Sequence, residues 1–171
     1  MAIESSKGVD YEARRAALRE TYMVPAPERQ ATSARGVHHL ALICSDIERT
    51  IQFYTQVFGF PLVELFQNRD LPSSTHFFFD IGNGNLLAFF DFPEHPMPPT
   101  CEAIGGMHHV AISVEPEQFA AIRGRLTERG IANLGPAQAT HSLYVHDPDG
   151  ALIEIHAAPL RVVGGNRVDE R

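Results

Sequence analysis

The chain has 171 residues, of which 44% are hydrophobic and 20% charged, a balance typical of a globular protein rather than a disordered one. Its formal net charge of −7 argues against non-specific nucleic-acid binding, because that binding needs basic side chains to neutralise phosphates. The sequence shows no membrane-spanning apolar run, no secretory signal and only two cysteines, Cys44 and Cys101, so we expect no disulfide framework and a cytoplasmic location.

Residues 1–35 are predicted to form an N-terminal extension ahead of the main fold. The segment from Tyr11 to Tyr22 is compatible with a short helix that Pro25 ends. Its apolar stripe is thin, so two interpretations stay open: a loosely packed arm, or an arm that packs on a partner subunit.

The first predicted module spans residues 36–93. It opens with a strand at 37–44, in which His39 lies on one face and an almost wholly apolar row lies on the other. The apolar face should lie under the helix that follows. Ser45 or Asp46 caps this helix, and its buried stripe and its stop are set by Ile47, Ile51, Tyr54, Phe58 and Gly59.

The remaining elements complete a repeat of the order strand, helix, strand, strand, strand. The first module ends with strands at 62–67, 76–81 and 86–92, and a proline-rich linker follows at 94–105. The second module spans 106–158, with a helix at 116–129 and strands at 107–114, 131–134, 142–146 and 151–156. A tail occupies 159–171. Two four-stranded sheets that face one another would enclose a cleft.

Three side chains at equivalent or facing strand positions suggest a metal site. His39 and His109 hold the same place in the first strand of each module, 70 residues apart, and Glu154 lies in the last strand opposite Ile153 and Ile155. Two imidazoles and one carboxylate suit a divalent metal with open positions for substrate or oxygen. Structural histidines and a solvent-facing glutamate are the alternative, but the duplicated His-His pair favours the metal.

The choice within each histidine pair follows from strand alternation. His38 and His108 share the faces that should lie under the helices, whereas His39 and His109 face the cleft. We therefore expect His39 and His109 to be the ligands. His38 and His108 should be packed, or should support the ligands from behind.

Three segments of the chain resemble the vicinal oxygen chelate superfamily: HHLALICSDIERTIQFYTQVFGF, GMHHVAISV and SLYVHDPDGALIEIH. This superfamily includes glyoxalase I, bleomycin-resistance proteins, fosfomycin transferases and extradiol dioxygenases. The resemblance covers about residues 36–157. It implies an α+β fold in which paired βαβββ modules form a curved sheet around a cleft, assembled as a homodimer. It also implies a metal on His39, His109 and Glu154.

Differences between this chain and individual members of the family reduce the number of reactions it could catalyse. Glyoxalase I has a fourth metal ligand, a glutamate, at the position where this chain has Ala88 or a neighbour. This chain therefore lacks a fourth ligand of the glyoxalase type, unless His76 or a second subunit supplies it. Fosfomycin transferases need basic residues for a phosphonate, but Lys7 is the only lysine and lies in the extension. Bleomycin-binding members lack the metal. The retained ligands argue against that class, and the missing acidic residue at Ala88 favours a site with more open positions.

Extradiol dioxygenases resemble the chain best in their ligand set, which holds Fe(II). They place a tyrosine ten residues before the glutamate, as Tyr144 stands here, although fosfomycin transferases share it. They also use a histidine as acid–base catalyst where this chain has Asn85. His141, His76 and His95 are candidates to replace it.

The resemblance thus implies a metalloenzyme, an Fe(II)-dependent extradiol-type dioxygenase that acts on a small aromatic or apolar oxygenated substrate. Mn(II), Ni(II), Co(II) and Zn(II) are the alternative metals. Tyr144 would stabilise developing charge and His141 would move protons. A phenylalanine cluster in the first module would line the cleft or fill the core. The alternative functions are a glyoxalase-type lyase or isomerase and a non-catalytic ligand-binding protein.

Overall fold

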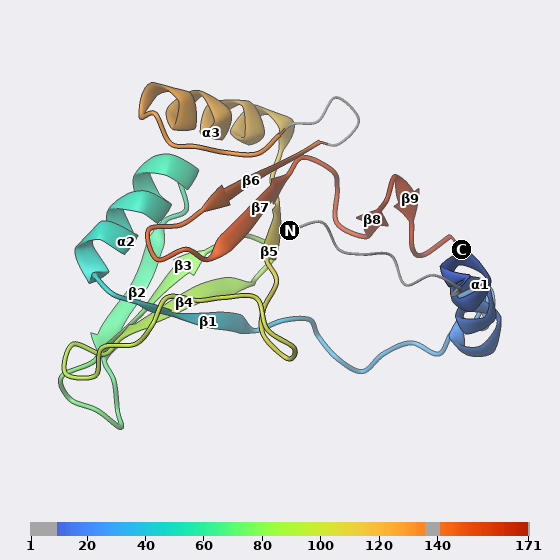
Figure 1. The fold of residues 1–171 in the computed structure, drawn as a ribbon, viewed down its shortest axis with the longest axis horizontal. Coiled ribbons are helices and arrows are strands. Elements are labelled where there is room, and N and C mark those ends of the chain that lie inside the picture. The colour runs from blue at the N-terminus through green and yellow to red at the C-terminus, as the bar shows by residue number, and fades with distance from the viewer. Residues whose placement is uncertain (1–9, 136–140, 171) are drawn as a thin grey trace. The chain divides into compact units, whose positions relative to one another are not determined.

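The computed structural model describes residues 10–135 and 141–170. The chain divides into two compact units. The main unit is Ala34–Leu160, and the other combines Met1–Ser33 with Arg161–Arg171. Strands and helices mix within the main unit, which confirms the α+β class (Figure 1). None of the helices in the described residues is long and apolar enough to cross a membrane.

The first module forms a four-stranded sheet in the order β1-β4-β3-β2. β1 pairs in parallel with β4, and the other neighbours pair antiparallel. Between β1 and β2 the chain crosses over through a helix, as a parallel arrangement requires. The elements are β1 (His39–Cys44), α2 (Ile47–Phe53) with its continuation η2 (Tyr54–Phe58), β2 (Leu62–Gln67), β3 (Thr75–Asp80) and β4 (Leu86–Asp91).

The second module repeats this order with one strand fewer. Its elements are β5 (Val110–Ser113), α3 (Pro116–Glu128), β6 (Ser142–His146) and β7 (Leu152–His156), and its sheet order is β5-β7-β6. The strand predicted at 131–134 is wrong, because only Leu134 pairs, through an isolated bridge to Tyr144. Leu134 is 71% exposed, so Ile131 is the one apolar side chain of this segment that packs against the core. Among the described residues the second sheet therefore has three strands instead of four.

The end of α2 differs from a regular helix. Asp46 is its N-cap, with the carboxylate accepting the Arg49 backbone N–H at 2.9 Å, and Gly59 ends it in the left-handed region at φ 76°. Its last turn, η2, is a π-helix. The wider turn places Val57 and Phe58 in the core and leaves their carbonyls without helical partners.

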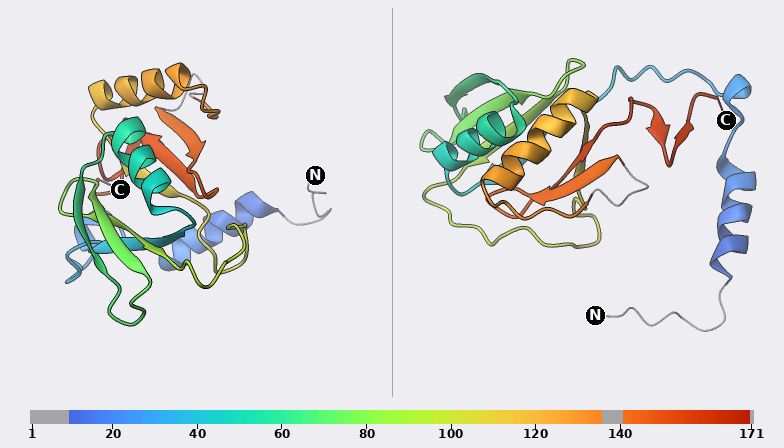
Figure 2. Two further views of the ribbon diagram at one scale, coloured as in Figure 1. Left: turned by 90° about the vertical axis from the view of Figure 1, so that its left-hand side faces the viewer. Right: turned by 90° about the horizontal axis from the view of Figure 1, so that it is seen from above.

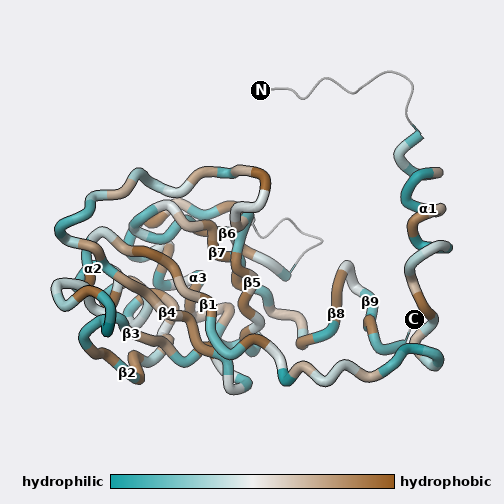
Figure 3. Tube along the Cα trace, turned by 90° about the horizontal axis from the view of Figure 1, so that it is seen from below, coloured by the Kyte–Doolittle hydropathy of each residue, from teal (hydrophilic) through white to brown (hydrophobic). Residues whose placement is uncertain are grey.

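Those carbonyls bind α3, so the two modules dock through their helices. Arg125 Nε donates to Val57 O at 2.7 Å, and Gln118 Nε2 donates to Phe58 O at 2.5 Å. Figure 2 shows α2 and α3 side by side. One hydrophobic core collects buried residues of both modules, among them Phe58, Phe77, Phe79, Leu87, Phe89, Ile112, Ile122, Leu126, Leu143, Ile153 and Ile155. In Figure 3, which colours the trace by hydropathy, β4 has the brown of hydrophobic residues.

The turn between β6 and β7 fastens the second module to the first. Asp147 accepts the backbone N–H groups of Asp149 and Ala151 and the buried hydroxyl of Tyr54, the last at 3.1 Å. Asp149 accepts from Ser45 and pairs with Arg49 at 2.8 Å. Burial raises the pKa of the Asp147 carboxyl, although its N–H donors oppose that shift. We call this set of contacts the Asp147–Asp149 staple.

The other unit contains α1 (Tyr11–Tyr22), the 3-10 turn η1 (Ala26–Glu28) and a hairpin of β8 (Val162–Val163) and β9 (Asn166–Arg167). The helix forms where the sequence predicts one. Asp10 caps it by accepting from Glu12 N and Ala13 N. None of its residues is buried, and Arg29 ties the segment after it to the hairpin by donating to Val168 O at 2.6 Å.

Candidate metal centre

The three-stranded sheet brings a histidine, a carboxylate and a phenol together. The register aligns Ala111 of β5 and Tyr144 of β6 with Glu154 of β7, and His109 immediately precedes β5. His109 Nε2 lies 3.1 Å from Glu154 Oε2, and the His109 and Tyr144 rings meet edge to face at 6.0 Å. Glu154 lies on the face opposite Ile153 and Ile155, both fully buried, as strand alternation predicts.

The His109–Glu154 pair fits two adjacent positions of one metal ion. Two ligand atoms that each lie about 2.1 Å from a metal, at about 90° to one another, are about 3.0 Å apart. The observed separation of 3.1 Å agrees with this geometry. The Glu154 side chain is 12% exposed and that of His109 32%, so the pair is sheltered but reachable. Imidazole and carboxylate together suit Fe(II), Mn(II) or Zn(II).

Tyr144 lies beside this pair as a hydrogen-bond donor. Burial raises the pKa of its phenol, and its hydrogen bond to the Glu154 carboxylate raises it further. Both effects keep the hydroxyl protonated at neutral pH. Tyr144 therefore has a proton to offer to an oxygen atom that binds next to Glu154.

His39 lies in the other sheet, on the face that points away from α2. Leu40, Leu42 and Cys44 face the core, as predicted. The His39 ring lies 5.7 Å from that of Phe78 and 6.3 Å from that of His76.

Aromatic side chains continue this face across the sheet. The register places Phe66, His76 and Phe90 in one row over β2, β3 and β4, and Phe78 next to Ala88 in the following row. His76 stacks on Phe90 with ring centroids 3.7 Å apart. Its Nε2 is buried without a hydrogen-bond partner, and burial, followed by the neighbouring His39, lowers its pKa. We call Phe66, His76, Phe78 and Phe90 the aromatic face.

The structure joins two of the three predicted ligands. Among residues 10–135 and 141–170 there is no group of three His, Cys, Asp or Glu side chains that could hold a metal ion. His109 and Glu154 meet, while His39 lies on the first sheet. The physical reason is that the modules pack through α2, α3 and the Asp147–Asp149 staple, so the first sheet does not present His39 to Glu154 of the same chain.

The prediction that His38 and His108 pack under the helices is wrong. Both are exposed, and the His108 side chain is 68% exposed. Each precedes its strand, because β1 begins at His39 and β5 begins at Val110, so strand alternation does not apply to them. Instead each contacts the neighbouring ligand candidate, with Nδ1 atoms 2.9 Å apart in His38–His39 and 2.7 Å apart in His108–His109.

Two of the proposed acid–base histidines lie outside this cluster. His141 is exposed directly before β6, where its carbonyl accepts the Ala157 N–H at 2.8 Å. His95 is exposed in the linker. Only His76 lies near a ligand candidate, beside His39.

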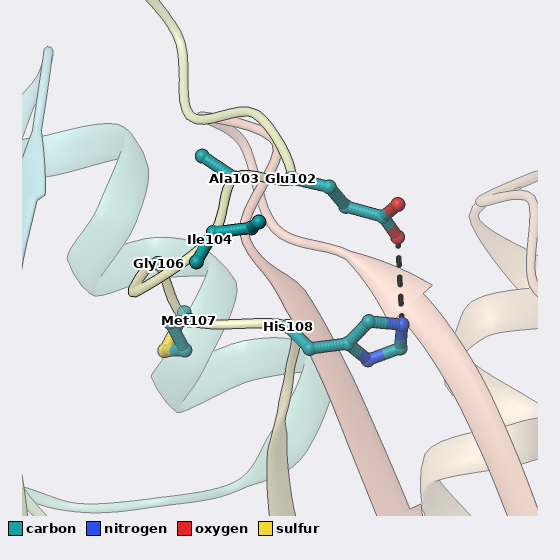
Figure 4. Close-up of a pocket in the computed structure, with 6 residues that line it drawn as sticks. All are labelled: Glu102, Ala103, Ile104, Gly106, Met107 and His108. Carbon is teal, nitrogen blue, oxygen red and sulfur yellow. Dashed lines mark ion pairs between the residues drawn. The ribbon is translucent and has the colours of Figure 1, made fainter.

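The linker adds a residue that sequence reasoning missed. Glu102 Oε1 lies 3.4 Å from His108 Nε2, at a pocket of about 310 Å³ (Figure 4). The pocket is lined by Glu102, Ala103, Ile104, Gly106, Met107 and His108. Nothing periodic marks Glu102 in the sequence, because the linker forms neither helix nor strand.

Known proteins share this arrangement of strands and helices. The chain is 32% identical over 132 residues to Metallothiol transferase FosB from Shouchella clausii, covering 73% of this chain and 82% of that protein. It is 28% identical over 123 residues to Catechol-2,3-dioxygenase from Bacillus subtilis, covering 71% of this chain and 41% of that protein.

A solved structure of fosfomycin resistance protein FosX from Listeria monocytogenes, complexed with Mn(II), has a TM-score of 0.56 at 20% identity, covering 75% of this chain and 96% of that one. The family model described as Glyoxalase/Bleomycin resistance protein/Dioxygenase superfamily matches residues 36–155. The chain belongs to this superfamily, which confirms the resemblance to vicinal oxygen chelate proteins.

Proposed function

We propose that this chain is a metal-dependent ring-cleaving dioxygenase of the extradiol type, with Fe(II) as its metal and a small aromatic diol as its substrate. The observation that carries the proposal is the aromatic face beside His39. His76 packs against Phe78 and Phe90, and Phe66 of the same face is 45% exposed, so Phe66 offers a ring on which a flat substrate can stack. The apolar surroundings favour an uncharged ring over a phosphonate.

The distribution of positive charge supports the same substrate class. Arg49 pairs with Asp149, Arg125 donates to Val57 O, and Arg129 donates to Gln56. These three guanidinium groups therefore serve the contact between the modules. Lys7, the only lysine of the sequence, lies outside the described residues. A doubly charged phosphonate would find little compensation on the aromatic face.

Each residue of the centre has a defined task. His109 Nε2 and Glu154 Oε2 hold the metal, and Tyr144 donates a hydrogen bond to the bound substrate oxygen as negative charge develops there. When bound there, Fe(II) would supply a Lewis acid that lowers the pKa of the diol. In the overall reaction one ring carbon–carbon bond breaks, and both atoms of O2 enter the product.

The third ligand comes from a second copy of the chain in this proposal. His39 is exposed on the face opposite α2, and the two ligands it would complete lie in the other sheet. In a twofold-symmetric dimer, each His39 faces the His109–Glu154 pair of the other copy, and two identical sites form. The aromatic face then becomes one wall of each site.

Oxygen uptake by the Fe(II)-loaded protein tests the reaction. With catechol in air we expect a yellow ring-opened product and one O2 consumed per product molecule. Glu154→Gln should abolish both, whereas Glu94→Gln, at an exposed linker position, should leave them unchanged. Product formed equally well without oxygen, or no oxygen uptake with any of a panel of catechols, would refute the dioxygenase.

The similarity to FosB supports a second candidate, a metal-dependent thiol transferase. Tyr144 and the His109–Glu154 pair are compatible with it, since neither is specific for oxygen chemistry. Incubation of the Mn(II)-loaded protein with fosfomycin and a low-molecular-weight thiol distinguishes the two. Consumption of the thiol without any oxygen uptake on catechols would select the transferase.

A further inference from the structure

A chain of four side chains leads from the linker to the candidate metal centre. Glu102 Oε1 lies 3.4 Å from His108 Nε2, His108 Nδ1 lies 2.7 Å from His109 Nδ1, and His109 Nε2 lies 3.1 Å from Glu154 Oε2. Figure 4 shows the first of these contacts at the edge of the pocket. Its outer end is exposed and its inner end is sheltered, so it connects solvent to the ligand pair.

The chemistry of the imidazole ring assigns a direction to this chain. A hydrogen bond between two Nδ1 atoms needs one N–H and one lone pair. His109 presents Nε2 to Glu154 and, when it binds a metal, Nε2 carries no hydrogen. Its Nδ1 then carries the hydrogen and donates to His108 Nδ1. His108, as the acceptor, keeps its own hydrogen on Nε2, which is the atom that faces Glu102.

We infer that His108 is a positioning residue for the metal ligand His109, and that Glu102 of the linker holds His108 in the accepting tautomer. The inference rests on the proposed metal centre and adds to it. His109 itself lies just before β5, and the residues that fix it, a histidine and a carboxylate, also lie outside the strands of the described residues. Partners of this kind orient a ligand ring and select the nitrogen that binds the metal.

The first module provides a built-in comparison. His38 Nδ1 lies 2.9 Å from His39 Nδ1, so His38 can accept from His39 in the same way. Among the described residues, no carboxylate lies within ion-pair distance of His38, whereas Glu102 serves His108. The two halves therefore share the histidine–histidine contact, and the second adds an acidic anchor.

Metal affinity tests the inference without recourse to activity. We measure the Kd for Mn(II) and for Zn(II) by competition with a chromophoric chelator, using the full chain freed of metal. His108→Phe removes the acceptor and should weaken binding by about 10–100-fold. His108→Gln retains a side-chain carbonyl as acceptor and should recover most of that loss. Glu102→Gln should give a smaller loss than His108→Phe.

His95→Phe is the matched control, because it places the same ring at another exposed histidine, one that lies in the linker. It should leave the Kd unchanged. Circular dichroism checks that each variant is folded. NMR of ¹⁵N-labelled histidines in the Zn(II)-loaded protein gives the second measurement: His109 should carry its hydrogen on Nδ1 in the wild type, and Glu102→Gln should weaken the Nδ1–Nδ1 hydrogen bond.

The outcomes separate this inference from the proposed function. Tight binding that Glu154→Gln abolishes but folded His108→Phe does not weaken would overturn the inference and leave the metal centre intact. Hydrogen on His109 Nε2 in the Zn(II)-loaded protein would overturn it as well. Wild-type protein that binds neither metal would overturn both.

Discussion

Mixing two inactive variants tests whether the metal centre spans two copies of the chain. His39→Ala removes the ligand on the first sheet, and Glu154→Ala removes one on the second. Each variant alone should bind almost no metal and form no product. In a twofold dimer, a mixed dimer has one site that lost both ligands and one site that keeps all three.

The magnitude follows from counting dimers. After equal amounts are unfolded together and refolded, half of the dimers are mixed, and each mixed dimer has one intact site of two. Bound metal and catechol turnover should therefore return to about one quarter of the wild-type value. Elemental analysis and oxygen uptake measure the two quantities, and sedimentation confirms the dimer.

A second mixture is the matched control. His109 and Glu154 belong to the same half of the site, so mixing His109→Ala with Glu154→Ala can restore no site. Recovery there would point to an artefact of refolding. If the mixture of His39→Ala and Glu154→Ala recovers nothing while sedimentation shows mixed dimers, the three ligands do not come together from two copies, and the reasoning is refuted.

Three further predictions concern the fold. Tyr54→Phe removes the hydroxyl that donates to buried Asp147 and should lower the free energy of unfolding by about 1.5–3 kcal/mol, measured by urea denaturation, whereas exposed Tyr22→Phe should change it by less than about 0.5 kcal/mol. Burial raises the folded-state pKa of Asp147, so the contribution of this carboxyl to stability is greatest at acid pH and is lost as pH rises through the folded-state pKa. The free energy of unfolding of the wild type, relative to that of Asp147→Asn, should therefore fall as pH rises through this range. A difference that stays constant with pH would contradict the pKa shift. Burial raises the pKa of Cys44 to about 11, so iodoacetamide at pH 8 should label exposed Cys101 and reach Cys44 only after unfolding, as mass spectrometry of peptides would show.

Local patterns predicted the faces of the strands. Glu154 lies opposite Ile153 and Ile155, and His39 lies opposite Leu40, because the side of a strand on which a residue lies depends only on its neighbours. The same reasoning failed for His38 and His108, since the strands begin two and three residues later than the apolar pattern suggests.

The relation between the modules could not be predicted in this way. The hydrogen bond from Tyr54 to Asp147 joins residues 93 apart, and that from Ser45 to Asp149 joins residues 104 apart. The sequence around Asp147 indicates a turn, which is correct, but nothing local shows what the turn binds. Where His39 lies relative to Glu154 depends on such contacts, so the ligand types were predictable and their assembly was not.

The shared core has a consequence for how the protein unfolds. Phe58 and Phe79 of the first module pack in the same hydrophobic cluster as Leu126 and Ile155 of the second. Neither module therefore has a separate hydrophobic core that would stay buried without the other. The repeat is therefore two copies of a motif but a single cooperative unit. A destabilising substitution in α2 should therefore also loosen β7, the strand that carries Glu154. A metal bound by His109 and Glu154 of the second module should in turn raise the thermal midpoint of the first module.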